Sequence, residues 1–130
     1  MARTTTRKPK TAAAEAAPVA SAPVIAAAPR PAAKLFCVTR SRGSAWDGSL
    51  AMEQQAEWPA HAAFMDGLER QGFVVVGGPL EDTPYLMLAV RAESLEVARA
   101  RLAEDPWEAA RIIETTRIVA WTLRLGAERI

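Results

Sequence analysis

The stretch WPAHAAFMDGLERQGFVVVGGP, residues 58–79, predicts a helix that leads directly into a strand. In its first part, apolar side chains and one histidine recur every 3.6 residues, so they share one side of a helix. Pro59 suits the first turn, where its missing N–H costs nothing, and Gly72 suits a left-handed cap after Gln71. The apolar run 73–76 then predicts a strand. This stretch therefore predicts a helix that packs by one face against a sheet.

Three further strands and a second helix complete an α+β pattern. Residues 35–39, 85–90 and 115–125 predict strands, and Ser94 suits the N-cap of a second helix. The Gly- and Pro-rich residues 77–84 predict a long loop between two antiparallel strands. The resulting order, β-α-β-β-α-β, is that of the ferredoxin-like fold. Because the apolar second face of such a sheet is commonly covered by another copy, we expect a homodimer.

The last predicted strand has a clear alternation of side chains. Along residues 115–125, one face is apolar and the other polar. The apolar face is predicted to consist of Val119, Trp121, Leu123 and Leu125. Regular alternation of this kind predicts a strand over the whole segment.

Charge is distributed unevenly along the chain. The net charge is +1 overall, but residues 1–34 carry +5 and the remainder carries −4. The acidic remainder offers no basic face, so we expect no nucleic acid partner. No run of eighteen apolar residues occurs, so we expect no membrane partner. The single cysteine, Cys37, excludes an intrachain disulfide and fits a reducing, cytoplasmic location.

Composition divides the chain into two parts. Residues 1–33 are rich in alanine and proline, and the repeated prolines interrupt every candidate helix. We expect this part to be a disordered tail, although its early arginines and scarcity of acids also fit an organellar transit peptide. Residues 34–126 predict a single folded domain.

His61 is the only histidine and lies in the apolar stripe of the first helix. An imidazole buried there needs a hydrogen-bond partner. Two interpretations remain open. His61 is either a core histidine bonded to a backbone carbonyl, or a proton carrier for acid–base catalysis.

The sequence Asp105-Pro106-Trp107-Glu108 predicts the start of a short helix. Asp105 suits the N-cap, Pro106 the first helical position, and Glu108 the return bond of a capping box. Asp105 is also a candidate partner that orients His61. An ionised carboxylate has about four acceptor sites and can serve both purposes, although the spacing alone favours capping.

Further residues are candidates for substrate binding, each with a more ordinary alternative. A segment without bulky side chains can let a ligand lie against the backbone, or it can be a plain turn. That segment consists of Gly77, Gly78 and Pro79. Of the four tryptophans, Trp58 and Trp107 could line a pocket for a planar molecule, although most tryptophans in a small domain belong to its core.

Two polar residues are weaker candidates for the same role. Arg40 and Gln55 could bind a substrate oxygen, although surface solvation is the more common role of each type. One histidine and one cysteine cannot build a typical zinc site. No phosphate-cradling glycine loop or nucleophile elbow is present either. We therefore expect no metal and no other cofactor.

Taken together, the motifs resemble those of the YCII-related (YciI-like) family over residues 35–126. They are Gly43…Trp46-Asp47, Gln55-x-x-Trp58-x-x-His61-Ala62-x-Phe64-Met65, Gly72-Phe73-Val74-Val75-Val76-Gly77-Gly78-Pro79-Leu80, Leu102-Ala103-x-Asp105-Pro106-Trp107 and the closing Trp121. The resemblance implies a dimeric α+β barrel, in which two ferredoxin-like sheets face each other. It also implies a His–Asp pair at His61 and Asp105, with Gly77, Gly78 and Pro79 lining the same cavity. Ser44 departs from the family pattern, which has proline there.

The resemblance also bears on activity. One group of relatives is linked to dehydrochlorination of a hydroxylated chloroaromatic, and muconolactone isomerases share the fold. We therefore expect a small-molecule lyase or isomerase, in which His61 moves a proton on an aromatic or enol-like substrate and Asp105 fixes its tautomer. The alternative is a non-catalytic small-molecule-binding or accessory dimeric module. Catalysis predicts that the two side chains meet beside a cavity with room for a ring.

Overall fold

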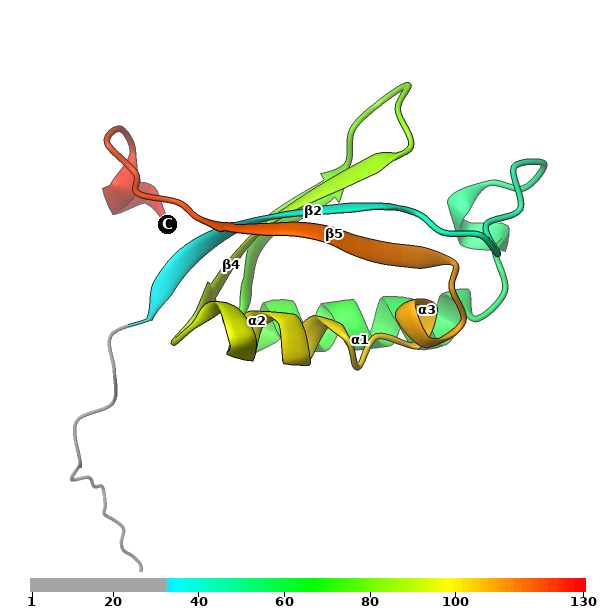
Figure 1. Ribbon diagram of the computed structural model, residues 1–130, viewed down its shortest axis with the longest axis horizontal. Helices are drawn as coiled ribbons and strands as arrows, with labels where there is room; N and C mark the ends of the chain where they lie inside the picture. Colours follow the sequence, from blue (N-terminus) through cyan, green and yellow to red (C-terminus); the bar gives the residue numbers. More distant parts are fainter. Residues whose placement is uncertain (1–32) are drawn as a thin grey trace, which may run out of the picture. The chain divides into compact units, whose positions relative to one another are not determined.

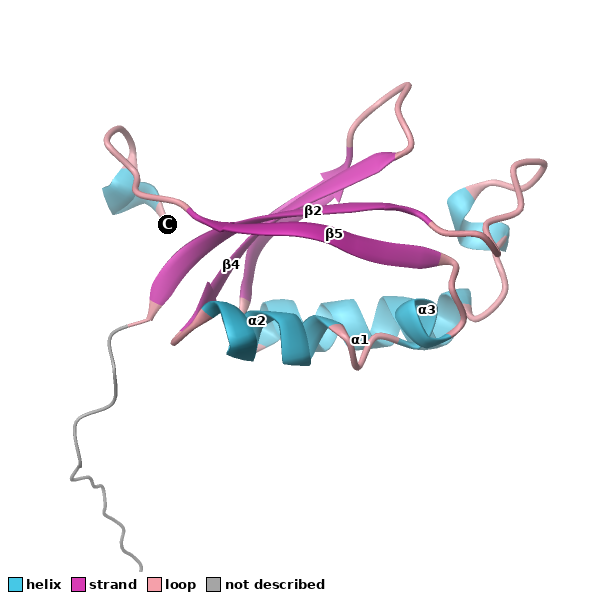
Figure 2. Ribbon diagram, viewed as in Figure 1, coloured by secondary structure: helices cyan, strands magenta, loops and turns pink. Residues whose placement is uncertain are grey.

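A computed structural model describes residues 33–130, and all but the last residue of the predicted disordered tail lies outside them. In this part, helices cover one face of a four-stranded sheet (Figure 1). The strands are β2 (Lys34–Arg42), β3 (Val74–Pro79), β4 (Tyr85–Ala92) and β5 (Ile113–Ala120). The helices are α1 (Trp58–Arg70), α2 (Leu95–Leu102) and α3 (Pro106–Ala109), with short 3₁₀ turns η3 (Met52–Gln54) and η4 (Ala127–Arg129). Figure 2 shows the same arrangement by secondary structure.

The sheet has the strand order β3-β4-β2-β5, and each neighbouring pair is antiparallel. The first strand of the domain therefore pairs with both the third and the fourth. This order, together with the two crossover helices, confirms the predicted ferredoxin-like α+β fold.

Helix α1 has the limits that its sequence predicts. It spans 13 residues with Pro59 in its first turn, and its last carbonyls are capped before Gly72, which has a φ of +79°. Its two buried residues are His61 and Leu68. Thus the helix places the histidine on the side that faces the sheet.

Two groups of buried side chains fill the space between helices and sheet. The main core is almost wholly aliphatic, and it consists of Phe36, Val38, Leu68, Phe73, Val74, Leu88, Val90, Ala92, Ala98, Leu102 and Ile118. The aromatic core consists of Trp107, Ile112 and Ile113, with Trp46, Met52, Trp58, Leu86 and Ala110 packed against them. The aromatic core adjoins the candidate site described below.

The predicted strand 115–125 is shorter than expected at its C-terminal end. Strand β5 stops at Ala120. The last hydrogen bond between β5 and β2 runs from the Trp121 N–H to the Leu35 carbonyl and is 2.9 Å long. Strand β2 begins one residue before Leu35, so β5 has no further partner within the described residues. The alternating pattern alone does not make a strand, because a strand needs a neighbour to bond with.

The face of the sheet opposite the helices is open in the single chain. It presents apolar side chains, including Met87, Val119 and Trp121, which are 38%, 40% and 44% exposed. A shallow hollow of about 410 Å³ lies among them and is also lined by Cys37 and Thr39. No helix within residues 33–130 has both the length and the apolar character needed to cross a membrane.

Candidate functional site

A cavity of about 250 Å³ lies where α1 meets the sheet. Five of the predicted substrate-binding residues are in its wall, namely Arg40, Trp58, Gly77, Gly78 and Pro79. His61 and Met65 contribute to it from α1, and Met52, Leu86, Leu88 and Ile113 make its apolar surface. The cavity is thus a mainly apolar space with two basic side chains in its wall.

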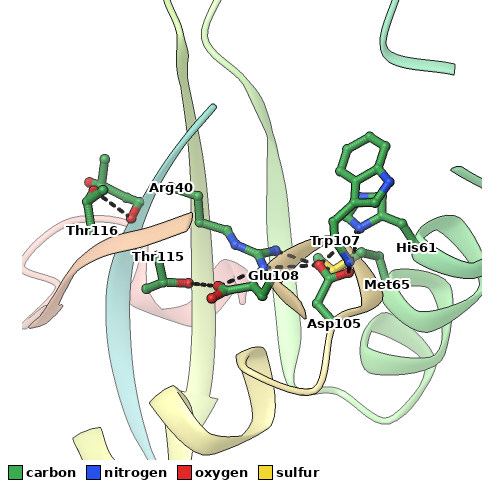
Figure 3. Close-up of polar contacts among 9 residues, drawn as sticks. Arg40, His61, Met65, Asp105, Trp107, Glu108, Thr115 and Thr116 are labelled. Atoms are coloured by element: carbon green, nitrogen blue, oxygen red, sulfur yellow. Dashed lines mark hydrogen bonds and ion pairs between the residues drawn. The ribbon is translucent and has the colours of Figure 1, made fainter. Parts of the chain in front are cut away.

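His61 meets Asp105 at this cavity, although 44 residues separate them in the chain (Figure 3). Nδ1 of the imidazole is 2.9 Å from each of the two carboxylate oxygens. An ionised carboxylate only accepts hydrogen bonds, so Nδ1 carries the proton in the neutral ring. Nε2 is then the nitrogen with a free lone pair, and the structure shows no hydrogen bond to it within residues 33–130. The imidazole therefore has one nitrogen fixed and one available.

The carboxylate of Asp105 is fully buried and serves three donors. Its Oδ1 accepts the backbone N–H of Trp107 at 2.9 Å, which is the N-cap bond of α3. Its Oδ2 is 3.0 Å from Nη2 of Arg40. The same side chain thus caps a helix and contacts His61, so the two interpretations of Asp105 do not exclude each other.

The surroundings of Asp105 favour its charged form. Burial alone would raise the pKa of this carboxyl group, because a charge is poorly solvated in the interior. The hydrogen bonds from His61 and Trp107, with the positive charge of Arg40, outweigh burial and hold the pKa below its ordinary value of 3.8. Asp105 is therefore ionised at neutral pH, as a partner for an imidazolium must be.

Arg40 lies in the cavity wall, but its guanidinium is paired mainly with carboxylates of the protein. It is 1% exposed, and its Nη2 lies 3.0 Å from both Asp105 and Glu108. Nη1 is 3.8 Å from the Met65 sulfur, and the buried Nε has no hydrogen-bond partner among the described residues. The guanidinium thus has little charge left to neutralise a ligand.

The predicted capping box at Glu108 is not formed. The Asp105 N–H, which Glu108 was expected to bind, donates instead to the Leu102 carbonyl at the end of α2. The Glu108 carboxylate accepts hydrogen bonds from Arg40 and Thr115 (Figure 3). A guanidinium is a stronger partner than a backbone amide that is already bonded, so the ion pair prevails.

Two predicted ligand-binding residues lie outside the cavity wall. Trp107 is fully buried and stacks on the imidazole of His61, with ring centroids 3.8 Å apart and planes at 5°. Its Nε1 donates to the Ala56 carbonyl at 2.7 Å. The side-chain amide of Gln55 is hydrogen-bonded to the loop before α1. Its oxygen accepts the Asp47 N–H, and its nitrogen donates to the Asp47 and Leu50 carbonyls. The structure therefore gives both residues packing and loop contacts instead of a place in the wall.

The pairing of Arg40 with acids could have been anticipated from the sequence. Phe36, Val38 and Arg40 alternate along β2, and the first two face the main core. The period of two therefore points Arg40 inward as well. An inward guanidinium needs a buried acid, but which acid it meets depends on the fold.

The fold and this site define a ferredoxin-like α+β protein with a buried His–Asp contact beside a cavity. The sequence model of the YCII-related domain matches residues 24–122, so the chain belongs to the YCII-related family. Among solved structures, the chain is similar to 5-chloro-2-hydroxyhydroquinone dehydrochlorinase (TftG) from Burkholderia phenoliruptrix AC1100, in complex with 2,5-dihydroxybenzoquinone. The TM-score is 0.50 at 22% identity, over 72% of this chain and 97% of that one. No curated protein matches the chain significantly.

Proposed function

We propose that this chain is a small-molecule lyase or isomerase that uses His61 and Asp105 for proton transfer on an aromatic or enol-like substrate. The observation that carries the proposal is the 2.9 Å contact between Nδ1 of His61 and the Asp105 carboxylate at the wall of a cavity. A backbone carbonyl, the partner expected for a purely structural histidine, does not occupy Nδ1. The charged partner and the free Nε2 are what a general base requires.

The proposed step begins with a neutral imidazole. Nε2 of His61 takes a proton from a carbon or hydroxyl of the substrate, and the Asp105 carboxylate stabilises the imidazolium that results. The same nitrogen then returns the proton to another substrate atom, or to a leaving group. A positioned side chain of this kind typically contributes about 10²–10⁴ in rate.

The walls of the cavity fit a planar substrate. The indole of Trp58 and the side chains of Met52 and Leu86 offer apolar contacts for a ring. At Gly77, an added Cβ would collide with the Leu88 side chain, so this glycine makes room for a residue of the cavity wall. At Gly78, nothing lies within 4 Å of an added Cβ, and the bare backbone leaves space for a ring beside β3.

The structurally similar protein TftG is a dehydrochlorinase of 5-chloro-2-hydroxyhydroquinone, and its structure holds 2,5-dihydroxybenzoquinone. We propose the same broad substrate class for this chain, namely hydroxylated or oxidised six-membered rings. The support is the shared fold together with the aromatic and apolar cavity wall.

The experiment measures proton exchange in D₂O. A panel of hydroxylated aromatics and enols is incubated with the protein, and loss of substrate C–H signals is followed by proton NMR. We expect exchange or conversion of at least one compound by the wild type and a decrease of at least about 10²-fold in His61→Gln. Glu96→Gln, an exposed change on α2, is the inert control.

The same panel distinguishes catalysis from the non-catalytic alternative. Ligands that stabilise wild type and His61→Gln equally in thermal shift, with no exchange by either protein, would support a binding module. Equal exchange rates in the two proteins would show that His61 does not transfer the proton.

We also propose that a second copy of the chain covers the open face of the sheet. The support is the row of half-exposed apolar side chains there, including Met87, Val119 and Trp121. Contiguous apolar surface of this kind commonly marks an interface. In light scattering after size exclusion, we expect a dimer for the wild type and a monomer for Trp121→Arg. Val97→Arg, at an exposed apolar position on α2, should remain dimeric.

A further inference from the structure

Glu108 is a charged residue of the site that the proposed proton transfer leaves unused. Its side chain is only 19% exposed, and its Oε2 is 3.0 Å from Nη2 of Arg40. Thr115 donates a hydrogen bond to the same oxygen from β5. Glu108 is thus fixed from two strands of the sheet.

The guanidinium of Arg40 is shared between two carboxylates. Its Nη2 has two hydrogens and lies 3.0 Å from both Oδ2 of Asp105 and Oε2 of Glu108. Oδ2 of Asp105 is also 2.9 Å from Nδ1 of His61. Oδ2 of Asp105 therefore faces both Arg40 and His61, and Glu108 shares the positive charge of the guanidinium with it.

The sum of charges around His61 depends on Glu108. The imidazole contacts Asp105 directly, at 2.9 Å, and Asp105 in turn contacts Arg40, which contacts Glu108, at 3.0 Å in each case. Asp66 and Glu69 of α1 line the same cavity, and both are exposed to solvent, where their charges are screened. Without Glu108, the guanidinium charge would offset more of the charge of the Asp105 carboxylate. An imidazolium at His61 would then be stabilised less than in the wild type.

We propose that Glu108 is a positioning residue of this site: by sharing Arg40 with Asp105, it keeps the Asp105 carboxylate available to His61 and offsets the guanidinium charge when His61 takes up a proton. This inference rests on the proposed role of His61 in proton transfer. Interactions between charges of this kind are strongest where the site is poorly solvated. The network therefore extends from the cavity, through Asp105 and Arg40, to the partly exposed Glu108.

The test is an NMR titration of the imidazole. His61 is the only histidine, so its ring C–H signals report this one group without ambiguity. Glu108→Gln keeps the size of the side chain and an acceptor oxygen but removes the charge. We expect its titration midpoint to move to lower pH by about half a unit or more, equivalent to an about threefold lower ratio of imidazolium to neutral imidazole at a given pH. Glu96→Gln should titrate like the wild type.

Further variants separate charge from shape. Glu108→Asp keeps the charge and should titrate close to the wild type. A midpoint in Glu108→Gln that equals the wild type, or a shift in Glu108→Asp as large as in Glu108→Gln, would overturn the proposal. If Glu108→Gln does not fold, Thr115→Val loosens Glu108 without removing a charge. It should lower the midpoint, and an unchanged midpoint would overturn the proposal.

The titration uses no substrate. The positioning role of Glu108 can therefore fail while His61 still proves to be the proton carrier. Conversely, a shifted midpoint together with an inert His61 in the exchange assay would reject the proposed function and leave the electrostatic coupling established.

Discussion

The main core and the aromatic core lie under the same sheet but are built on different principles. The main core buries only hydrocarbon side chains, and its stability comes from the area removed from water. Beside the aromatic core, the protein buries Arg40, His61 and Asp105, each less than 10% exposed. There, stability depends on every charge keeping its partner. The comparison teaches that the loss of a single side chain has the greater effect at the end of the domain that holds the candidate site.

The largest effect is expected from Asp105→Ala. The change leaves the buried guanidinium of Arg40 short of a partner, removes the N-cap of α3 and frees His61. Breaking a buried ion pair from one side typically destabilises a protein by about 3–5 kcal/mol. Urea unfolding measures the loss. A decrease in the free energy of unfolding of less than about 1 kcal/mol would mean that the part of the domain around Arg40 and His61 does not depend on paired charges.

A comparable but smaller loss is expected from Leu102→Ala in the main core. Leu102 is fully buried, and truncating such a residue costs about 2–5 kcal/mol, depending on how far the cavity collapses. We expect the His61 titration midpoint to stay at its wild-type value in this variant. A shifted midpoint would show that the two cores are coupled, and it would weaken the distinction drawn between them.

Acid should lower the free energy of unfolding through the charged residues beside the aromatic core, and not through the main core. The pKa of Asp105 is lowered in the folded protein, although burial opposes this, because His61, the Trp107 N–H and Arg40 favour the carboxylate. Its contribution to stability is therefore complete above the ordinary value of 3.8 and is lost as the pH falls through the lower folded-state pKa. In unfolding curves between pH 7 and 3, the wild type should lose more stability on acidification than Asp105→Asn. Parallel curves for the two proteins would contradict this origin of the pH dependence.

The smallest effect is expected at the start of α2, on the main-core side. The Ser94 hydroxyl oxygen accepts the Val97 N–H at 3.1 Å. Ser94→Ala should therefore destabilise the protein by about 1 kcal/mol, and Ser94→Asp should retain most of the wild-type stability. Thermal unfolding resolves the difference. Neither variant should change the His61 titration.

Features that depend on neighbours in sequence were predicted well. The limits of α1 follow from Pro59 and Gly72, and the cap of α2 follows from Ser94, because each signal acts within one helical turn. The strand order followed from the alternation of elements. The extent of β5 did not, because a strand ends where its partner ends, and Trp121 is opposite the start of β2.

The candidate site shows the same division. The contact between His61 and Asp105 was anticipated from a resemblance in motifs and not from spacing, since 44 residues separate the two. Glu108 was assigned to a local cap, but its partner is Arg40, 68 residues away. Gln55 and Trp107 were predicted to line the cavity, and they lie outside its wall. The sequence shows which side chains can form polar or aromatic contacts, but it does not show which of them already have partners within the protein.

The parallel stack of His61 on Trp107 has a practical consequence. With 3.8 Å between the ring centroids, a positive charge on the imidazole would sit directly over the indole, where a cation interacts favourably with the π electrons. An imidazolium so placed also accepts an electron readily from the excited indole. The fluorescence of Trp107 should therefore decrease as His61 takes up its proton, and the emission intensity would report the protonation state of His61.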